Sequence, residues 1–64
     1  MKPEDMYDNL KRGVTLYRII RKDGKLTTFE IISTEKNISE LKKMLNCDNV
    51  NPSLIWDCLG KARE

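Results

Sequence analysis

Two short runs rich in β-branched and aromatic residues, separated by an Asp-Gly pair, constrain the fold of this chain more than any other feature. The runs cover residues 14–21 and 25–33, and Asp23-Gly24 lies between them. An Asp-Gly pair in this setting is a strong signal for a β-hairpin. Both faces of the predicted hairpin carry apolar residues, which a hairpin alone does not bury. We therefore expect either helices on both faces or one face that meets a partner chain.

Two registers of this hairpin are compatible with the sequence. A two-residue turn pairs Ile20 with Thr27, whereas a three-residue loop with a bulge at the glycine pairs Ile20 with Leu26. The second register matches like residues across the strands and places Arg18 close to Glu30, so we predict it. One face then holds Val14, Leu16, Ile20, Leu26 and Ile32, and the other holds Tyr17, Ile19, Phe29 and Ile31.

The segments on either side of the hairpin have helical patterns. Residues 3–12 begin with Pro3, which suits a first helical position, and end before Gly13, which suits a left-handed stop. Residues 37–46 begin with Asn37 as the predicted cap and repeat apolar residues at helical spacing.

A third helix is predicted over residues 52–63, with Asn51 as its cap. Its expected buried stripe consists of Leu54, Ile55, Cys58, Leu59 and Ala62. The predicted fold class is therefore α+β, a single small domain over residues 1–64 with the order α-β-β-α-α.

The residue inventory argues against an enzyme. The chain has no histidine, so the usual general base near neutral pH is missing. Cys47 and Cys58 do not make up a zinc site, and we expect both to be small buried residues with reduced thiols. No leader and no membrane-spanning run is present, which predicts a cytoplasmic protein. We expect no catalytic residue, no metal and no cofactor.

The two C-terminal helices and the polar turn between them are typical of a helix-turn-helix. In such a motif the first helix braces the second, whose outward side chains lie in the major groove of DNA. Lysines and arginines near the helices then contact phosphates. The residues predicted to bind nucleic acid are Lys42, Lys43, Ser53, Trp56, Lys61 and Arg63.

Short motifs in the same part of the chain resemble the nuclease-associated modular domains found beside phage and organelle homing nucleases. They are Asp23-Gly24-Lys25, Phe29, Ile38-Ser39-Glu40-Leu41, Ser53-Leu54-Ile55 and Cys58-Leu59-Gly60-Lys61, spread over residues 17–63. The resemblance implies DNA binding through a helix-turn-helix, in a small regulator of phage origin, with Ser53, Lys61 and Arg63 in contact with DNA. The aromatic-ended strand that often closes such modules is expected to be missing.

A protein partner is the alternative. Charge is nearly balanced, at +2, and one apolar hairpin face is in surplus. On this interpretation the protein is an inhibitor or adaptor that docks on a larger host or partner protein. On the DNA-binding interpretation, an uncovered apolar hairpin face offers a route to a homodimer. The residues predicted to bind a protein are Tyr17, Ile19, Phe29, Ile31 and Trp56. Neither interpretation involves a membrane or a small-molecule substrate.

Overall fold

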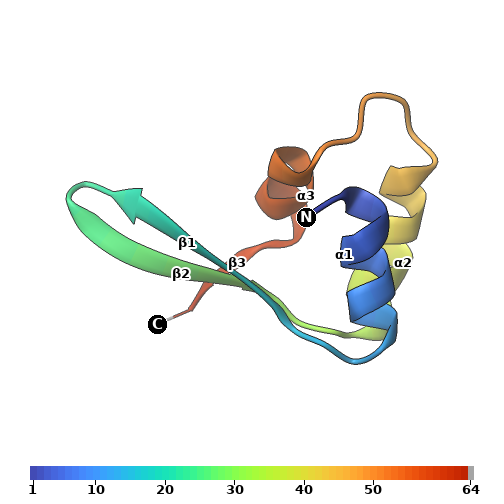
Figure 1. The fold of residues 1–64 in the computed structure, drawn as a ribbon, viewed down its shortest axis with the longest axis horizontal. Helices are drawn as coiled ribbons and strands as arrows, with labels where there is room; N and C mark the ends of the chain where they lie inside the picture. The colour runs from blue at the N-terminus through green and yellow to red at the C-terminus, as the bar shows by residue number, and fades with distance from the viewer. Residues whose placement is uncertain (64) are drawn as a thin grey trace.

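The computed structural model describes residues 1–63, which form three helices and a three-stranded antiparallel sheet (Figure 1). The α+β class predicted from the sequence is confirmed. In chain order the elements are α1 (Pro3–Lys11), β1 (Leu16–Lys22), β2 (Lys25–Ile31), α2 (Glu35–Leu45), α3 (Pro52–Leu59) and β3 (Lys61–Arg63). The strand order is β1-β2-β3, so β1 and β3 are the two edges of the sheet.

The hairpin has the two-residue turn, and the predicted three-residue loop is wrong. Ile20 pairs with Thr27, and Leu26 pairs with Arg21. Asp23 and the glycine after it both have positive φ, at 53° and 76°. Two positive φ values in succession define the tight turn whose twist matches that of the flanking strands. Turn geometry therefore decides the register, ahead of the matching of like side chains.

This register exchanges the faces of β2 relative to the prediction, as a slip of one residue must. The inner face, whose base faces the helices, holds Leu16, Arg18, Ile20, Lys22, Lys25, Thr27, Phe29, Ile31 and Ala62. The outer face holds Tyr17, Ile19, Arg21, Leu26, Thr28, Glu30, Lys61 and Arg63. Arg18 and Glu30 are on opposite faces, so the predicted pair between them is wrong.

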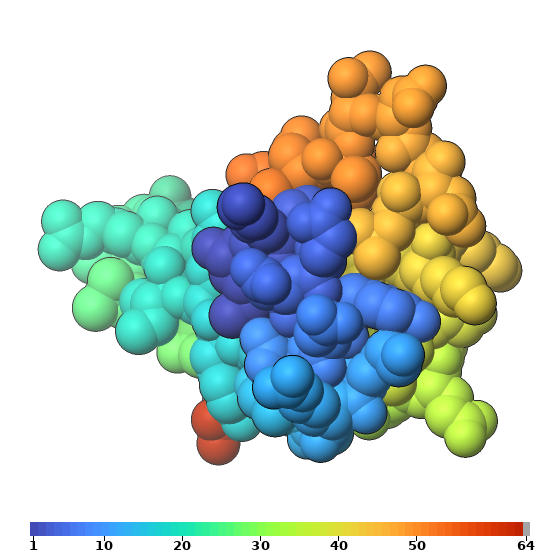
Figure 2. Space-filling view, turned by 45° about the vertical axis from the view of Figure 1, so that its right-hand side comes forward, coloured from blue at the N-terminus to red at the C-terminus, as the bar shows by residue number. Residues whose placement is uncertain are grey.

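The core is small and lies at the open end of the hairpin, where the three helices meet the sheet. Six side chains are buried, and they come from every element except β3: Met6, Leu10, Leu16, Ile31, Leu41 and Ile55. The far end of the hairpin extends away from the helices (Figures 1 and 2). That arm is therefore held by its own strand pairing, whereas its base is held by the core.

The first two helices differ in how well their ends were predicted. Gly13, just beyond α1, has a φ of 86° and supplies the expected left-handed stop. The predicted cap at Asn37 is wrong, because α2 begins earlier, at Glu35. Thr34 is the cap, and its hydroxyl oxygen accepts the Asn37 N–H at 3.1 Å. The Asn37 side chain instead donates to the carbonyl oxygen of Ile32 at 2.8 Å, which ties the helix to the end of β2.

The third helix starts as predicted but ends early. The side chain of Asn51 caps it by accepting a backbone N–H three residues on, at 2.9 Å. Its last residue is Leu59, so the predicted helix over residues 52–63 is wrong beyond that point. The predicted order α-β-β-α-α also lacks a third strand, whereas Lys61–Arg63 form β3 and pair with β2.

The chain passes from α3 to β3 at Gly60, which lies against Trp56. A Cβ atom added to Gly60 would lie 2.5 Å from the carbonyl oxygen of Trp56 and 3.0 Å from its ring. The Gly60 N–H donates to that same oxygen at 2.9 Å. A residue without a side chain is therefore needed where the chain passes the indole.

The buried stripe predicted for α3 is narrower than expected. Ile55 is fully buried and Leu59 is half-buried, but Leu54 and Cys58 are exposed and Ala62 lies in β3. Cys47 is exposed as well, so the prediction of two buried cysteines is wrong, although both are free thiols. A helix of eight residues turns only one side towards so small a core.

Candidate nucleic-acid interface

The outer face of the sheet exposes three large apolar side chains. Tyr17 is 55% exposed, Ile19 is 67% exposed and Leu26 is 70% exposed. Tyr17 and Ile19 are neighbours on this face of β1, and Leu26 stands on the adjacent strand. Single exposed apolar residues are ordinary on a protein surface, whereas several on one face indicate a binding surface.

Cationic side chains surround this apolar patch on the same face. Arg21 is directly opposite Leu26 on β1, and Arg63 is directly opposite Thr28 on β3. The guanidinium carbon of Arg63 lies 5.6 Å from the centre of the Tyr17 ring, within cation–π range. The short third strand therefore adds a charge to the patch and orients it against the aromatic ring.

Charge is segregated between the sheet and the helices. Residues 16–31 and 61–63 contain six Lys or Arg against two Asp or Glu, whereas the rest of the chain contains six against eight. The basic excess extends to the tip of the hairpin, where Lys22 and Lys25 flank the turn. A chain with a net charge of only +2 thus has a distinctly positive sheet.

The residues predicted to bind nucleic acid do not form one surface. Lys42 and Lys43 are exposed in the last turn of α2, where the Lys43 ammonium lies 4.0 Å from a carboxylate oxygen of Glu40. Ser53 is exposed in the first turn of α3. Lys61 and Arg63, predicted on that helix, are on β3 and belong to the outer face of the sheet.

The residues predicted to bind a protein are divided by the sheet. Tyr17 and Ile19 are on the outer face, but Ile31 is fully buried and Phe29 is half-buried on the inner face. Trp56 is half-buried and packs against the core.

The sequence-based prediction missed Arg21 and Leu26 on the exposed face. The signal that could have placed them is the preference of Asp-Gly for a two-residue turn, because that register puts both residues beside Tyr17 and Ile19.

Two further properties bear on the class of protein. No helix within residues 1–63 combines the length and the apolar character needed to cross a bilayer. In the same residues, no three side chains of the metal-binding types gather where they could hold an ion.

The chain matches no family model, no curated protein and no solved structure. The resemblance to nuclease-associated modular domains therefore stays a prediction.

Proposed function

We propose that this protein binds DNA through the outer face of its sheet and that it prefers unpaired bases to an intact duplex. The observation that carries the proposal is the mixture on that face of exposed apolar side chains with Arg21 and Arg63. Nucleic acid presents the same two chemistries, since bases offer flat apolar surfaces and phosphates offer negative charge. A protein partner would not by itself account for the excess of basic residues in the sheet.

The preference for unpaired bases follows from the apolar part of the patch. In a duplex the base faces are stacked on one another, so a protein meets mainly phosphates and base edges. In a single strand a base is free to stack on an aromatic ring such as that of Tyr17. Ile19 and Leu26 extend the apolar surface along the same face, where Arg21 and Arg63 are placed to contact the phosphates of the strand.

Fluorescence anisotropy with a labelled single-stranded 20-mer and its duplex, at 50 and 200 mM salt, tests the proposal. We expect tighter binding to the single strand, with an affinity that falls steeply as salt rises because counterions are released. Tyr17→Ala removes the stacking ring and should weaken single-strand binding by roughly 5- to 150-fold, corresponding to ~1–3 kcal/mol per stacked base.

Two charge-matched double variants locate the surface. Arg21→Ala with Arg63→Ala removes two positive charges from the sheet, and Lys42→Ala with Lys43→Ala removes two from α2. We expect the first pair to weaken binding strongly and the second to change it less than about threefold, since only the first pair contacts the ligand. Duplex binding that is lost with the α2 pair and with Ser53→Glu would instead identify the helix-turn-helix surface. Absence of DNA binding at 50 mM salt would refute both the outer face and the helix-turn-helix as DNA-binding surfaces.

A further inference from the structure

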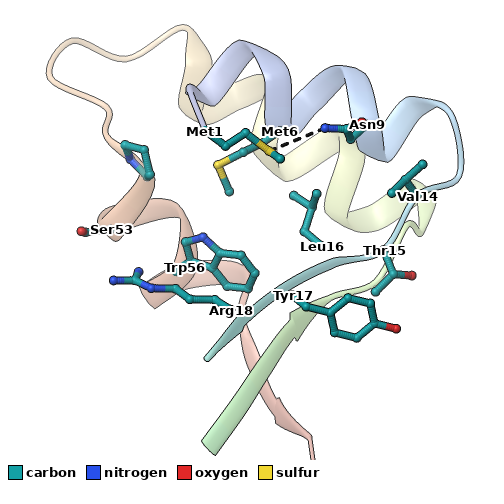
Figure 3. A pocket seen from close by; sticks show the side chains of 11 residues that line it. Met1, Met6, Asn9, Val14, Thr15, Leu16, Tyr17, Arg18, Ser53 and Trp56 are labelled. Carbon is teal, nitrogen blue, oxygen red and sulfur yellow. Dashed lines mark hydrogen bonds between the residues drawn. The ribbon is translucent and has the colours of Figure 1, made fainter. Parts of the chain in front are cut away.

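A groove that has Tyr17 in common with the outer face runs between β1, α1 and α3. Its volume is about 660 Å³. Met6, Leu16 and Trp56 supply apolar walls, and Arg18 and Ser53 lie at its mouth (Figure 3). The N-terminal Met1 lies across one end, where its sulfur accepts a long hydrogen bond of 3.6 Å from the side-chain amide of Asn9 (Figure 3).

The groove follows the free edge of β1. It is lined by five consecutive residues, from Val14 to Arg18. Successive side chains of a strand point to opposite faces, so a groove that touches all of them lies along the strand's edge. No strand of residues 1–63 pairs with β1 on this side, because β1 is the first strand of the sheet.

The backbone of β1 has hydrogen-bonding groups directed at this groove. In a hairpin with a two-residue turn, the pair that flanks the turn, here Lys22 and Lys25, exchanges both backbone hydrogen bonds. The alternation along an antiparallel strand then directs the N–H and C=O groups of Arg18 towards β2 and those of Tyr17 towards the open edge. An extended peptide laid in the groove would meet those groups.

The charged side chain at the mouth of the groove indicates which polar group a ligand should carry. Arg18 is exposed. The ion pair found within residues 1–63 joins Lys43 to Glu40 and does not involve Arg18. The Arg18 guanidinium is therefore available to a ligand. A carboxylate is the partner that its planar fork of donors matches best.

We propose that this groove binds an extended segment of a partner protein, which pairs with the free edge of β1, packs a bulky apolar side chain against Trp56, and places an acidic group on Arg18. Strand addition to an exposed edge, with pockets that read alternate side chains, is a general mode of peptide recognition. The free backbone groups at Tyr17 favour a peptide over a fatty acid, which shares the apolar and acidic chemistry but has no amides to pair with a strand.

Trp56 is the only tryptophan of the chain and lines the groove, so its fluorescence reports occupancy. The probes are capped hexapeptides of β-branched residues that contain one phenylalanine, followed one, two or three residues later by aspartate. We expect a saturable change in Trp56 emission with at least one spacing. Replacement of that aspartate by lysine should weaken binding at least tenfold, and so should N-methylation of the peptide amides that pair with β1.

A charge reversal makes the test specific. Arg18→Glu should weaken the aspartate peptide at least tenfold and make the lysine peptide the tighter ligand. Lys42→Glu is the matched control, since it also reverses an exposed positive charge but lies on α2, away from the groove, and should leave peptide binding unchanged. Circular dichroism checks that both variants are folded.

Two results would overturn the proposal. One is the absence of a saturable change with every peptide of the series. The other is a pair of findings: decanoate binds with an affinity that depends on Arg18, and N-methylated and unmodified peptides bind equally well. Together they would mean that the groove binds an apolar carboxylate without strand pairing. Neither result bears on DNA binding by the outer face, because that binding depends on the Tyr17 ring, Arg21 and Arg63 and not on Arg18 or the backbone edge of β1.

Discussion

The inner and outer faces of the sheet place similar side chains in opposite surroundings. Ile31, on the inner face, is fully buried beside α1 and α2, whereas Ile19, on the outer face, is 67% exposed. Leu16 and Leu26 form a second such pair, since Leu16 is buried and Leu26 is exposed. Both faces of the strands carry large apolar residues, so the position of the helices decides which of them hold the fold together and which remain available to a ligand.

Replacing one isoleucine on each face by alanine tests this difference most strongly. Ile31→Ala should lower the free energy of unfolding by about 2–5 kcal/mol, because it leaves a cavity in the core. A domain of this size has little stability to lose, so much of this variant should be unfolded at 37 °C. Ile19→Ala should stay within about 0.5 kcal/mol of the original chain.

Urea unfolding followed by Trp56 fluorescence measures both variants. Similar losses for the two isoleucines would show that the outer face is also packed in solution, for instance against a second copy of the chain. In that case the loss from Ile19→Ala should shrink as the protein is diluted.

A smaller loss of stability is expected from Gly60→Ala. This substitution affects the packing of Trp56 and also the position of β3, which carries Arg63 on the outer face. The new Cβ would meet the Trp56 carbonyl oxygen and ring, so the indole or β3 must shift. We expect a loss of about 1–3 kcal/mol in unfolding free energy, typical of overpacking. Weaker single-strand binding should accompany it, because β3 carries Arg63. Ser39→Ala, at an exposed position of α2, is the control and should change neither quantity. A Gly60→Ala variant as stable as the original would mean that the approach of Gly60 to Trp56 is loose.

The smallest effect is expected within the outer face itself. A double-mutant cycle of Tyr17→Ala and Arg63→Ala should give an interaction free energy of about 0.5–1 kcal/mol, the usual range for an exposed cation–π pair. Urea unfolding of the four proteins gives this value. An interaction free energy above about 2 kcal/mol would contradict the view that the outer face contributes little to stability.

The first five elements could be predicted from the sequence because each has a local cause. Asp23-Gly24 specifies the hairpin, Gly13 ends α1, and Asn51 with the proline after it starts α3. These signals depend on a few neighbouring residues. The α+β class and the order of the first five elements therefore followed from short stretches of chain.

The features that were missed depend on contacts between distant parts of the chain. The three residues of β3 have no strand pattern of their own and pair only because Gly60 brings them to the edge of β2. Thr34 and Asn37 are both suitable caps, and the path of the chain out of β2 selects Thr34.

The candidate site was predicted only in part, for a similar reason. Its members come from three strands, and the register that assembles them differs from the predicted one. The groove beside β1 also depends on how α1 and α3 approach the strand, which no local pattern shows.

The two-residue turn restricts how this hairpin can change in length during evolution. An insertion of one residue into either strand would move every later side chain of that strand to the other face, bringing Leu26 or Thr28 inward and leaving Phe29 outside. An insertion of two residues into each strand keeps the pairing below it, the faces of the arm and a hydrogen-bonded pair beside the turn. Related hairpins with this turn are thus expected to differ in length by multiples of four residues, so that the arm becomes longer or shorter while its two faces keep their separate roles.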